Sequence, residues 1–305
     1  MMRQAFVSAC AGVTVVGVVA VGCTSQQTQS AGSAGSRSQL REPTDTEQIL
    51  LRRAQQTLVK ACMEGAGFKY WIGPLPTVDE LKGGGYVLTD VSWARKHGYG
   101  SRFKERLQDV QRNDPNNAYA NSLPQEERVR YSKVLEGGES SAMLKAELPG
   151  GGAIQTPRHG CQADAKDQLY GDFGAWFRAE KIAIGLPARY VPDLLNDQRF
   201  VNAVESWSVC MGKAGHDYAT PQEIREKLPD LTADMTKKEA YATEVDMAVA
   251  EATCATETAL SRTAHALEDE YRNKQPQKYL KAVATYQRMT LAALPRAKDI
   301  TRATG

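Results

Sequence analysis

The chain has 305 residues, of which 38 are lysine or arginine and 36 are aspartate or glutamate. This near-neutral balance, without any long basic run, argues against nucleic acid as a partner. Beyond the N-terminal leader and the polar stretch that follows it, about 260 residues remain, enough for one large core or two small ones.

The first 22 residues have the layout of an export signal. Arg3 precedes an uncharged run from Ala5 to Val21, and the small residue Gly22 comes directly before Cys23. Small or aliphatic residues before a cysteine resemble the lipobox of bacterial lipoproteins, in which the cysteine thiol receives a diacylglycerol and signal peptidase II cuts before it. We therefore expect a signal peptide over 1–22 and a lipid anchor, palmitate included, on Cys23. An uncleaved membrane helix is the alternative, since the run is near the lower length limit for spanning a bilayer.

The expected anchor places the protein on the outer face of the cytoplasmic membrane. Two acyl chains make anchoring stable, whereas a single chain gives only reversible binding. Residues 23–43 are rich in serine, glutamine, glycine, alanine and threonine, which predicts a flexible tether between the membrane and the folded part. The membrane, contacted through the lipid, is thus the first expected partner.

A nine-residue phrase occurs twice, as residues 62–70 and as residues 210–218. We call each copy the Cys-Met phrase. The copies share a Cys-Met pair, an Ala-Gly pair and a tyrosine at a constant offset of 148 positions. The shared residues that we expect to matter structurally, besides the cysteines, are Met63, Gly67, Tyr70, Met211, Gly215 and Tyr218. Such an internal repeat predicts two related structural units.

Each copy of the phrase is expected to end a helix. Thr44 lies three residues before Glu47, a capping-box pattern that predicts a helix from there to the first copy. A second helix is predicted from about Asp197 to the other copy. Gly67 and Gly215 are the expected stops, because a helix C-terminus commonly needs a residue in the left-handed conformation.

A second capping pattern follows each copy of the phrase. In the ranges 77–80 and 220–223 a threonine again precedes a glutamate by three residues, which predicts a short helix at each place. A further pattern of this kind, at Thr236, opens a long predicted helix that carries Cys254. Each copy therefore predicts the order helix, glycine stop, aromatic turn and short helix.

Four cysteines are left once Cys10 leaves with the signal and Cys23 carries lipid. They are Cys62, Cys161, Cys210 and Cys254. An even number in an oxidising compartment predicts disulfides, but four cysteines allow three pairings that sequence alone does not decide. If each unit contains its own disulfide, the pairs are Cys62 with Cys161 and Cys210 with Cys254, and this is the pairing we expect.

The two expected pairs enclose segments of different length, with separations of 99 residues in the first pair and 44 in the second. The first unit therefore contains an insertion. Within it we predict a short strand over 86–91, helices around 103–110 and 125–135, and a glycine-rich loop over 137–152.

The predicted fold is mainly α-helical, because apolar residues recur at helical spacing and alternating β-branched runs are few. We expect two disulfide-stapled helical units, over 44–190 and 191–295, with a long, loop-rich insertion in the first. The helical pattern after Cys254 breaks at Pro276 and stops at Pro295, so residues 296–305 are predicted to form a disordered tail.

Several short motifs recur together in one group of bacterial proteins. They are the lipobox, the doubled Cys-Met phrase, Asn116-Asn117-Ala118-Tyr119, Leu123-Pro124, Tyr131, Gly160-Cys161 and Leu169-Tyr170-Gly171. With these motifs the chain resembles a group of uncharacterised lipoproteins and secreted proteins from actinobacteria, over most of its length from Leu50 to about Ala259. The resemblance implies no established activity, so it carries over no catalytic residue.

No catalytic residue, metal site or cofactor is predicted. The four histidines, His97, His159, His216 and His265, are scattered and lack the i, i+4 spacing that places two zinc ligands on one helix face. No serine lies on a glycine-flanked nucleophile turn. Ser101 and Lys104 match a spacing found in penicillin-recognising enzymes, but the Lys-Thr-Gly element that those enzymes also need is absent.

Two binding alternatives involve the Cys-Met phrases. Free cysteine and methionine side chains are soft ligands suited to Cu(I), but neighbours on a helix point about 100° apart. Disulfides and core methionines explain the same residues more simply. Tyr70, Trp71 and Tyr218 could line a groove for a glycan, although aromatic residues after a helix stop more often cover a core.

The expected function is that of a non-enzymatic binding or accessory module at the cell envelope, whose partner is an envelope protein or a cell-wall ligand. The expected anchor, tether and structural cysteines, without a catalytic constellation, support this hypothesis. The alternative is a cell-wall hydrolase that uses carboxylates of the insertion over 83–152, and the candidates are Asp109, Asp114, Glu126 and Glu127.

Overall fold

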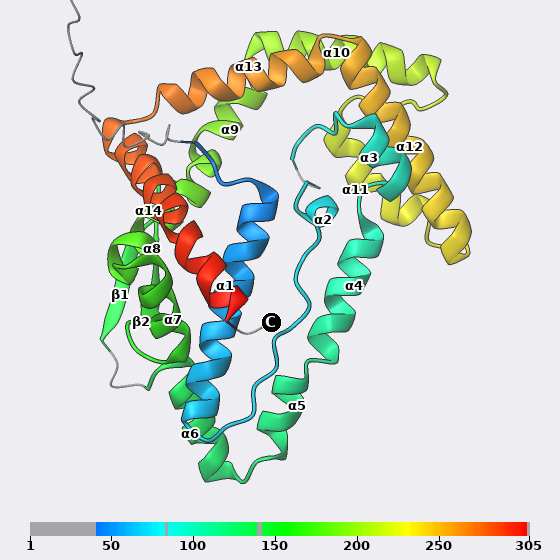
Figure 1. Cartoon of the computed structure of the whole chain (residues 1–305). Coiled ribbons are helices and arrows are strands. Elements are labelled where there is room, and N and C mark those ends of the chain that lie inside the picture. The colour runs from blue at the N-terminus through cyan, green and yellow to red at the C-terminus, as the bar shows by residue number, and fades with distance from the viewer. Residues whose placement is uncertain (1–40, 83–84, 139–141, 304–305) are drawn as a thin grey trace, which may run out of the picture. The chain divides into compact units, whose positions relative to one another are not determined.

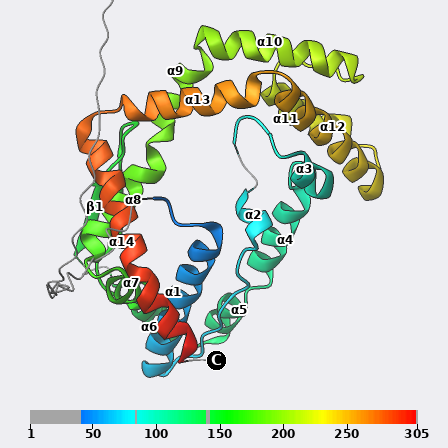
Figure 2. The ribbon, with the colours of Figure 1, turned by 45° about the horizontal axis from the view of Figure 1, so that its top comes forward.

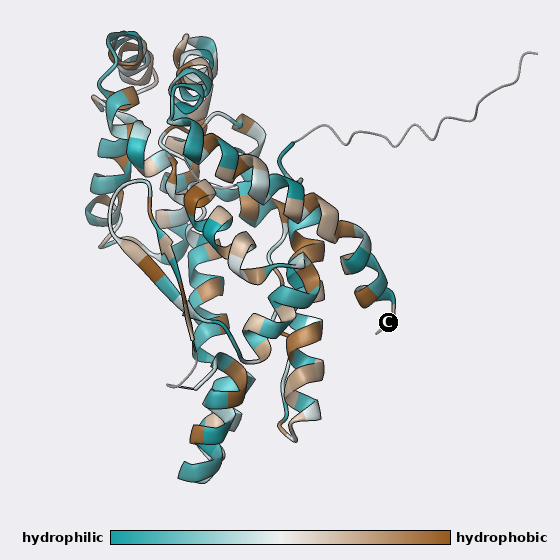
Figure 3. Cartoon of the chain, turned by 90° about the vertical axis from the view of Figure 1, so that its left-hand side faces the viewer, coloured by the Kyte–Doolittle hydropathy of each residue, from teal (hydrophilic) through white to brown (hydrophobic). Residues whose placement is uncertain are grey.

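The computed structural model describes residues 41–82, 85–138 and 142–303, which are mainly helical, as the sequence predicts (Figure 1). The predicted signal peptide, Cys23 and the predicted tether up to residue 40 lie outside the described residues. In the described ranges, no helix combines the length and the hydropathy needed to cross a membrane. Hydrophilic and hydrophobic residues alternate along the helices (Figure 3), as expected for helices that bury one face.

The helices and strands follow one another in three groups. The first helices are α1 (Asp45–Gly65), α2 (Val78–Lys82), α3 (Val91–His97), α4 (Ser101–Arg112), α5 (Pro115–Ser122) and α6 (Gln125–Glu136). Then come β1 (Met143–Glu147), β2 (Ala153–Pro157), α7 (Cys161–Tyr170) and α8 (Phe173–Gly185). The last are α9 (Pro187–Leu195), α10 (Gln198–Lys213), α11 (Pro221–Leu231), α12 (Lys237–Glu257), α13 (Leu260–Asn273) and α14 (Gln277–Arg302).

Helix α1 begins at the predicted capping box. The Thr44 hydroxyl accepts the Glu47 N–H at 3.3 Å, and the Glu47 carboxylate accepts the Thr44 N–H at 2.8 Å. A cap of this kind stabilises a helix by about 1 kcal/mol. Leu51 and Ala54 are buried where α1 packs beside α14 and α7, and Figures 1 and 2 both show α1 next to α14.

The C-terminal segment differs from the prediction. Helix α14 runs through Pro295 to Arg302, so the expectation that order ends at residue 295 is wrong. Pro295 is exposed, and the backbone hydrogen bond that it cannot make therefore falls on the solvent side. Ala293 and Ala297 are both fully buried against the cluster that includes α1 and α8. Because tertiary packing supplies most helical stability, this buried face carries the helix past the proline.

A β-hairpin occupies much of the segment that the sequence predicts as a loop over 137–152. Strands β1 and β2 pair in antiparallel fashion. Leu144 and Ala146 alternate with exposed residues and belong to the buried cluster that α8 also contributes to. Gly151 and Gly152, with φ of 102° and 77°, lie in the turn that joins the strands. The glycines that suggested a loop therefore make a hairpin turn.

Residues 86–91, predicted to be a strand, form none. The Leu88 N–H donates to the Glu251 carboxylate at 2.8 Å, where a strand would need a backbone partner. Asp90 caps α3 by accepting the Trp93 N–H at 2.9 Å. The segment is therefore held by a side chain of α12.

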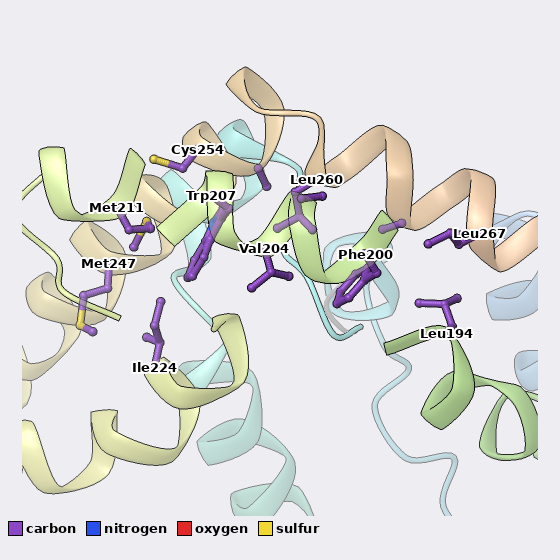
Figure 4. Close-up of a cluster of buried hydrophobic side chains, with 13 residues drawn as sticks. Leu194, Phe200, Val204, Trp207, Met211, Ile224, Met247, Cys254, Leu260 and Leu267 are labelled. Atoms are coloured by element: carbon purple, nitrogen blue, oxygen red, sulfur yellow. The ribbon is translucent and has the colours of Figure 1, made fainter. Parts of the chain in front are cut away.

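A second buried cluster lies among α9 to α13 (Figure 4). The Trp207 side chain of α10 is fully buried in it, and its indole N–H donates to the Glu251 carbonyl oxygen at 3.2 Å. The labelled members are Leu194, Phe200, Val204, Trp207, Met211, Ile224, Met247, Cys254, Leu260 and Leu267. The one polar group of the largest side chain in the cluster, the indole N–H, is thus hydrogen-bonded, as is usual for buried indoles.

Two helices pack with elements beyond the predicted unit boundary. Helix α14, predicted to belong to the second unit, packs on α1 and α8. Helix α3, predicted to belong to the first unit, packs on α12 through Ala94, Ala248 and Ala252. Residues 40–305 form one compact unit. The division at residue 190 stays a prediction, and buried clusters cross it.

Candidate binding groove along α4

The two copies of the Cys-Met phrase end α1 and α10 in the same way. Gly67 and Gly215 have φ of 87° and 88°. The N–H of the residue after each glycine donates to the carbonyl oxygen of Met63, at 3.0 Å, or of Met211, at 2.9 Å. This pattern is the Schellman motif, and both methionines are fully buried beneath it. The predicted glycine stops and core methionines are therefore confirmed.

The tyrosines of the phrase are fixed through their backbones. The Lys60 ammonium donates to the Tyr70 carbonyl oxygen at 3.2 Å, and the Ser208 hydroxyl donates to the Tyr218 carbonyl oxygen at 2.7 Å. Lys60 and Ser208 occupy equivalent positions in the two copies, and both tyrosines are half-buried. The exposed Trp71 that follows the first copy packs edge-on against Tyr119, with ring centroids 5.7 Å apart.

Both predicted disulfides are present, Cys62 with Cys161 and Cys210 with Cys254. The likeness between the copies is local, because Cys161 opens α7 whereas Cys254 lies near the end of α12. These contacts therefore do not establish a repeat of whole units. Since every cysteine of the described ranges is disulfide-bonded, none of them offers a thiolate to Cu(I).

Of the four carboxylates proposed for hydrolysis, three have structural partners and the fourth is exposed. Asp109 and Glu127 pair with arginines of their own helices. Asp114 caps α5 by accepting the backbone N–H two residues later at 2.8 Å. Glu126 is exposed in the first turn of α6. Within the described ranges, no group of three or more histidine, cysteine or acidic side chains could hold a metal ion.

A groove of about 1230 Å³ runs along α4, and we call it the α4 groove. Its other walls come from α1, from the segment 74–81, from the start of α12 and from α11. Small-molecule pockets commonly have roughly 300–1,000 Å³. The α4 groove is therefore larger than a typical small-molecule pocket.

Helix α4 leaves its apolar side only partly covered, because Phe103 packs against Trp93 and His97 while Leu107 stays exposed. Phe103, Leu107 and Val110 recur at i, i+4 and i+7, so they lie on one face of the helix, and all three line the groove. No residue of α4 is buried, and the Leu107 side chain is 58% exposed. An amphipathic helix in a folded protein normally buries this face.

The α4 groove carries an excess of positive charge. Seven of its lining residues are basic and three are acidic. The basic residues are Arg52, Arg102, Lys104, Arg106, Arg225, Lys237 and Lys238. Arg106, Arg225 and Lys237 each lie within 4.0 Å of a glutamate carboxylate. Among the residues that the structure describes, the other four have no acidic partner, so their charge is available to an anionic ligand.

Two buried glutamates of α12 fix the side of the groove where α4 begins. Glu244 accepts the Tyr99 N–H at 2.7 Å and the Ser101 N–H at 3.1 Å, and also accepts the Ser101 hydroxyl. Glu251, two turns later, accepts the Leu88 N–H and the Tyr99 hydroxyl, both at 2.8 Å. The first turn of α4 is therefore fixed, while Leu107 in a later turn stays exposed.

Glu251 is fully buried beside one cation. The Arg225 guanidinium donates to its Oε1 at 2.9 Å. Burial raises the pKa of the Glu251 carboxyl, while Arg225 and the hydrogen bonds act in the opposite direction. Burial, with the nearby Glu251 charge, also raises the pKa of the Tyr99 hydroxyl. All of the groups that bond to Glu251 belong to the folded chain itself. Glu251 therefore holds these segments together, and it is not placed to act as an exposed acid or base.

Sequence reasoning missed both glutamates and the exposed face of α4. The available signal was the seven-residue spacing of Glu244 and Glu251, which places two acids on the apolar face of an alanine-rich helix. Buried acids of this kind need hydrogen-bonding partners. Most of those partners come from Leu88, Tyr99 and Ser101, which lie far away in the chain.

Comparisons with protein-family models, with curated proteins and with solved structures found no match for this chain, so the case for the α4 groove rests on its own residues.

Proposed function

We propose that the protein is a lipid-anchored, extracytoplasmic binding module without enzymatic activity, whose α4 groove takes an anionic ligand. One observation carries the proposal: four cationic side chains of the groove have no acidic partner among the described residues. A surplus of charge in a concave surface attracts ligands of the opposite sign. The two disulfides support an oxidising location, since such bonds persist outside the cytosol.

The groove is better suited to binding than to catalysis. Its acidic lining residues are Glu80, Glu105 and Glu244. Glu80 is paired with Arg106, and Glu105 lies within 4.0 Å of Lys237. Glu244 accepts hydrogen bonds from Tyr99 and Ser101. A general acid or base needs access to the substrate proton. Glu80 and Glu244 are committed to structural partners, and Glu105 is an exposed side chain 4.0 Å from Lys237, whereas the unpaired groups are cations, which suit recognition of an anion.

A binding measurement with a defined polyanion tests this proposal. We would measure fluorescence anisotropy of labelled poly-L-glutamate with the full-length protein in mild detergent, and use poly-L-lysine as the opposite-charge probe. We expect binding of poly-L-glutamate only, weakened by added salt because exposed charges are screened. The charge-reversal variant Lys104→Glu/Lys238→Glu should bind at least about tenfold more weakly.

The matched control is Arg95→Glu/Arg128→Glu, which changes the net charge equally at exposed residues that do not line the groove. This control should bind like the wild type. An equal loss in both variants would show that net charge alone drives binding, and absence of binding to poly-L-glutamate would refute an anionic ligand. Release of fragments from peptidoglycan, lost in Glu126→Gln or Glu127→Gln, would establish the hydrolase instead.

A further inference from the structure

We infer that the ligand of the α4 groove is an acidic, amphipathic helical segment of another envelope protein, lying along α4. This inference rests on the proposed function and names the class of its ligand. It begins from the apolar face formed by Phe103, Leu107 and Val110, of which Leu107 is 58% exposed and the other two are half-buried.

Helix α4 has little packing support within the chain. It is 12 residues long, and its N-cap is Gly100, so its first turn is held by Glu244 of α12 and by no cap from its own segment. Isolated helices of about this length are marginal in water, and most helices in proteins are stabilised by packing of an apolar face. No residue of α4 is buried. A partner that covers Leu107 and the exposed parts of Phe103 and Val110 would supply further packing.

The shape and charge of the groove match a helical partner. The three apolar residues at i, i+4 and i+7 form a stripe of the kind that helix-in-groove recognition uses. At about 1.5 Å per residue, α4 offers a length of about 18 Å. Arg102 and Lys104 flank the stripe on α4, and Arg52 and Lys238 approach from other walls. A partner helix with an apolar stripe between acidic residues would satisfy both features.

Sugars, lipids and the protein's own tether fit less well. Sugars stack on free aromatic faces, but Arg102 covers the Tyr241 ring at 3.4 Å from its centroid, Phe103 packs against His97 with ring centroids 4.7 Å apart, and Trp93 is buried. An acyl chain needs a continuous apolar lining, whereas α1 contributes Arg52 and two glutamines to the wall. The predicted tether, residues 23–43, contains a single acidic residue, Glu42, which is too little charge to meet four cations.

The test compares two labelled peptides of identical composition with the full-length protein. One is a designed peptide of about four helical turns with leucine at i, i+3, i+4 and i+7 and glutamate elsewhere. The other is its scrambled form, which keeps the net charge but has no apolar stripe. We expect the amphipathic peptide to bind at least about tenfold more tightly, and to slow amide hydrogen exchange over residues 101–112.

Matched apolar variants locate the contact. Leu107→Ser should weaken binding of the amphipathic peptide by about tenfold, because burial of one leucine side chain is lost. Val129→Ser on α6 is the control: Val129 is 63% exposed, close to the 58% of Leu107, but lies outside the groove. Both substitutions are at exposed positions, so circular dichroism should show both variants folded.

The outcomes separate the inference from the proposed function. Equal binding of both peptides, with Leu107→Ser silent and Lys104→Glu/Lys238→Glu defective, would overturn the helical partner and leave an anionic ligand. Failure of both peptides and of poly-L-glutamate would overturn both. Binding to phosphatidylglycerol vesicles, lost in Leu107→Ser while neither peptide binds, would replace the helical partner by a lipid.

Discussion

Gly98 lies so close to Glu244 that a Cβ atom at this position would be 2.8 Å from the glutamate side chain. The φ of Gly98 is +60°, a conformation that other residues rarely adopt. Glu244 cannot easily move away, because it accepts hydrogen bonds from Tyr99 and Ser101. Glu244 therefore holds the start of α4, and its position leaves room only for a glycine at residue 98.

The substitution Gly98→Ala should destabilise the protein by about 2 kcal/mol or more, because strained backbone and a displaced Glu244 both contribute. Denaturant unfolding would measure this. The control is Gly73→Ala, since a Cβ at Gly73 would meet no atom within 4 Å and its backbone is not left-handed. If Gly98→Ala is as stable as that control, the close contact with Glu244 is not restrictive.

The buried Glu251 predicts a pH dependence of stability. Its pKa is higher in the folded protein than the ordinary value of 4.5, so the wild type loses stability from this group as the pH rises above that value. Glu251→Gln keeps an oxygen that can accept from Leu88 and Arg225, but it cannot ionise. The stability of Glu251→Gln relative to the wild type should therefore increase from pH 4 to pH 8.

Urea unfolding of both proteins at several pH values would check this difference. Comparing the two removes the contribution of every other titrating group, including Asp197, whose pKa its hydrogen bonds from Arg199 lower. A stability difference that stays constant with pH would mean that Glu251 ionises equally well in the folded and unfolded chains.

The left-handed glycines of the Cys-Met phrases predict matched losses. Gly67→Val and Gly215→Val should each destabilise by about 1 kcal/mol or more, because a β-branched residue disfavours this conformation. Gly65→Ala and Gly212→Ala, two and three residues earlier inside the helices, should instead stabilise by about 0.5–1 kcal/mol. Thermal melting of all four variants would decide, and unchanged melting of both valine variants would contradict the cap assignment.

Local signals predicted the helix ends well and the groove poorly. Thr44 and Gly67 act on backbone groups a few residues away, so their roles can be predicted from spacing alone. Glu251 instead bonds to Leu88, 163 positions earlier in the chain, and no local pattern encodes such a contact. The helix end predicted at Pro295 is wrong because the effect of this proline depends on burial of Ala293 and Ala297, which only the packing against α1 and α8 decides.

The proposed anchor predicts a specific change on Cys23→Ser. A serine has no thiol to accept the diacylglycerol, so the variant should lack the lipid mass and should no longer be retained by the membrane. Mass spectrometry of the purified protein and fractionation of cells would measure both. The variant Cys10→Ser, within the predicted signal peptide, is the control and should be lipidated normally. Membrane retention of Cys23→Ser would indicate an uncleaved spanning helix in place of a lipid anchor.

The two disulfides should contribute unequally to stability. In the chain-entropy model a cross-link stabilises more when it closes a longer loop, and separations of 99 and 44 residues correspond to about 4.7 and about 4.0 kcal/mol. Cys62→Ala/Cys161→Ala should therefore cost roughly 0.7 kcal/mol more than Cys210→Ala/Cys254→Ala. Denaturant unfolding of both double variants would measure the difference. A larger loss for the second pair would show that packing around Cys254 in the cluster of Trp207, and not loop closure, dominates its contribution.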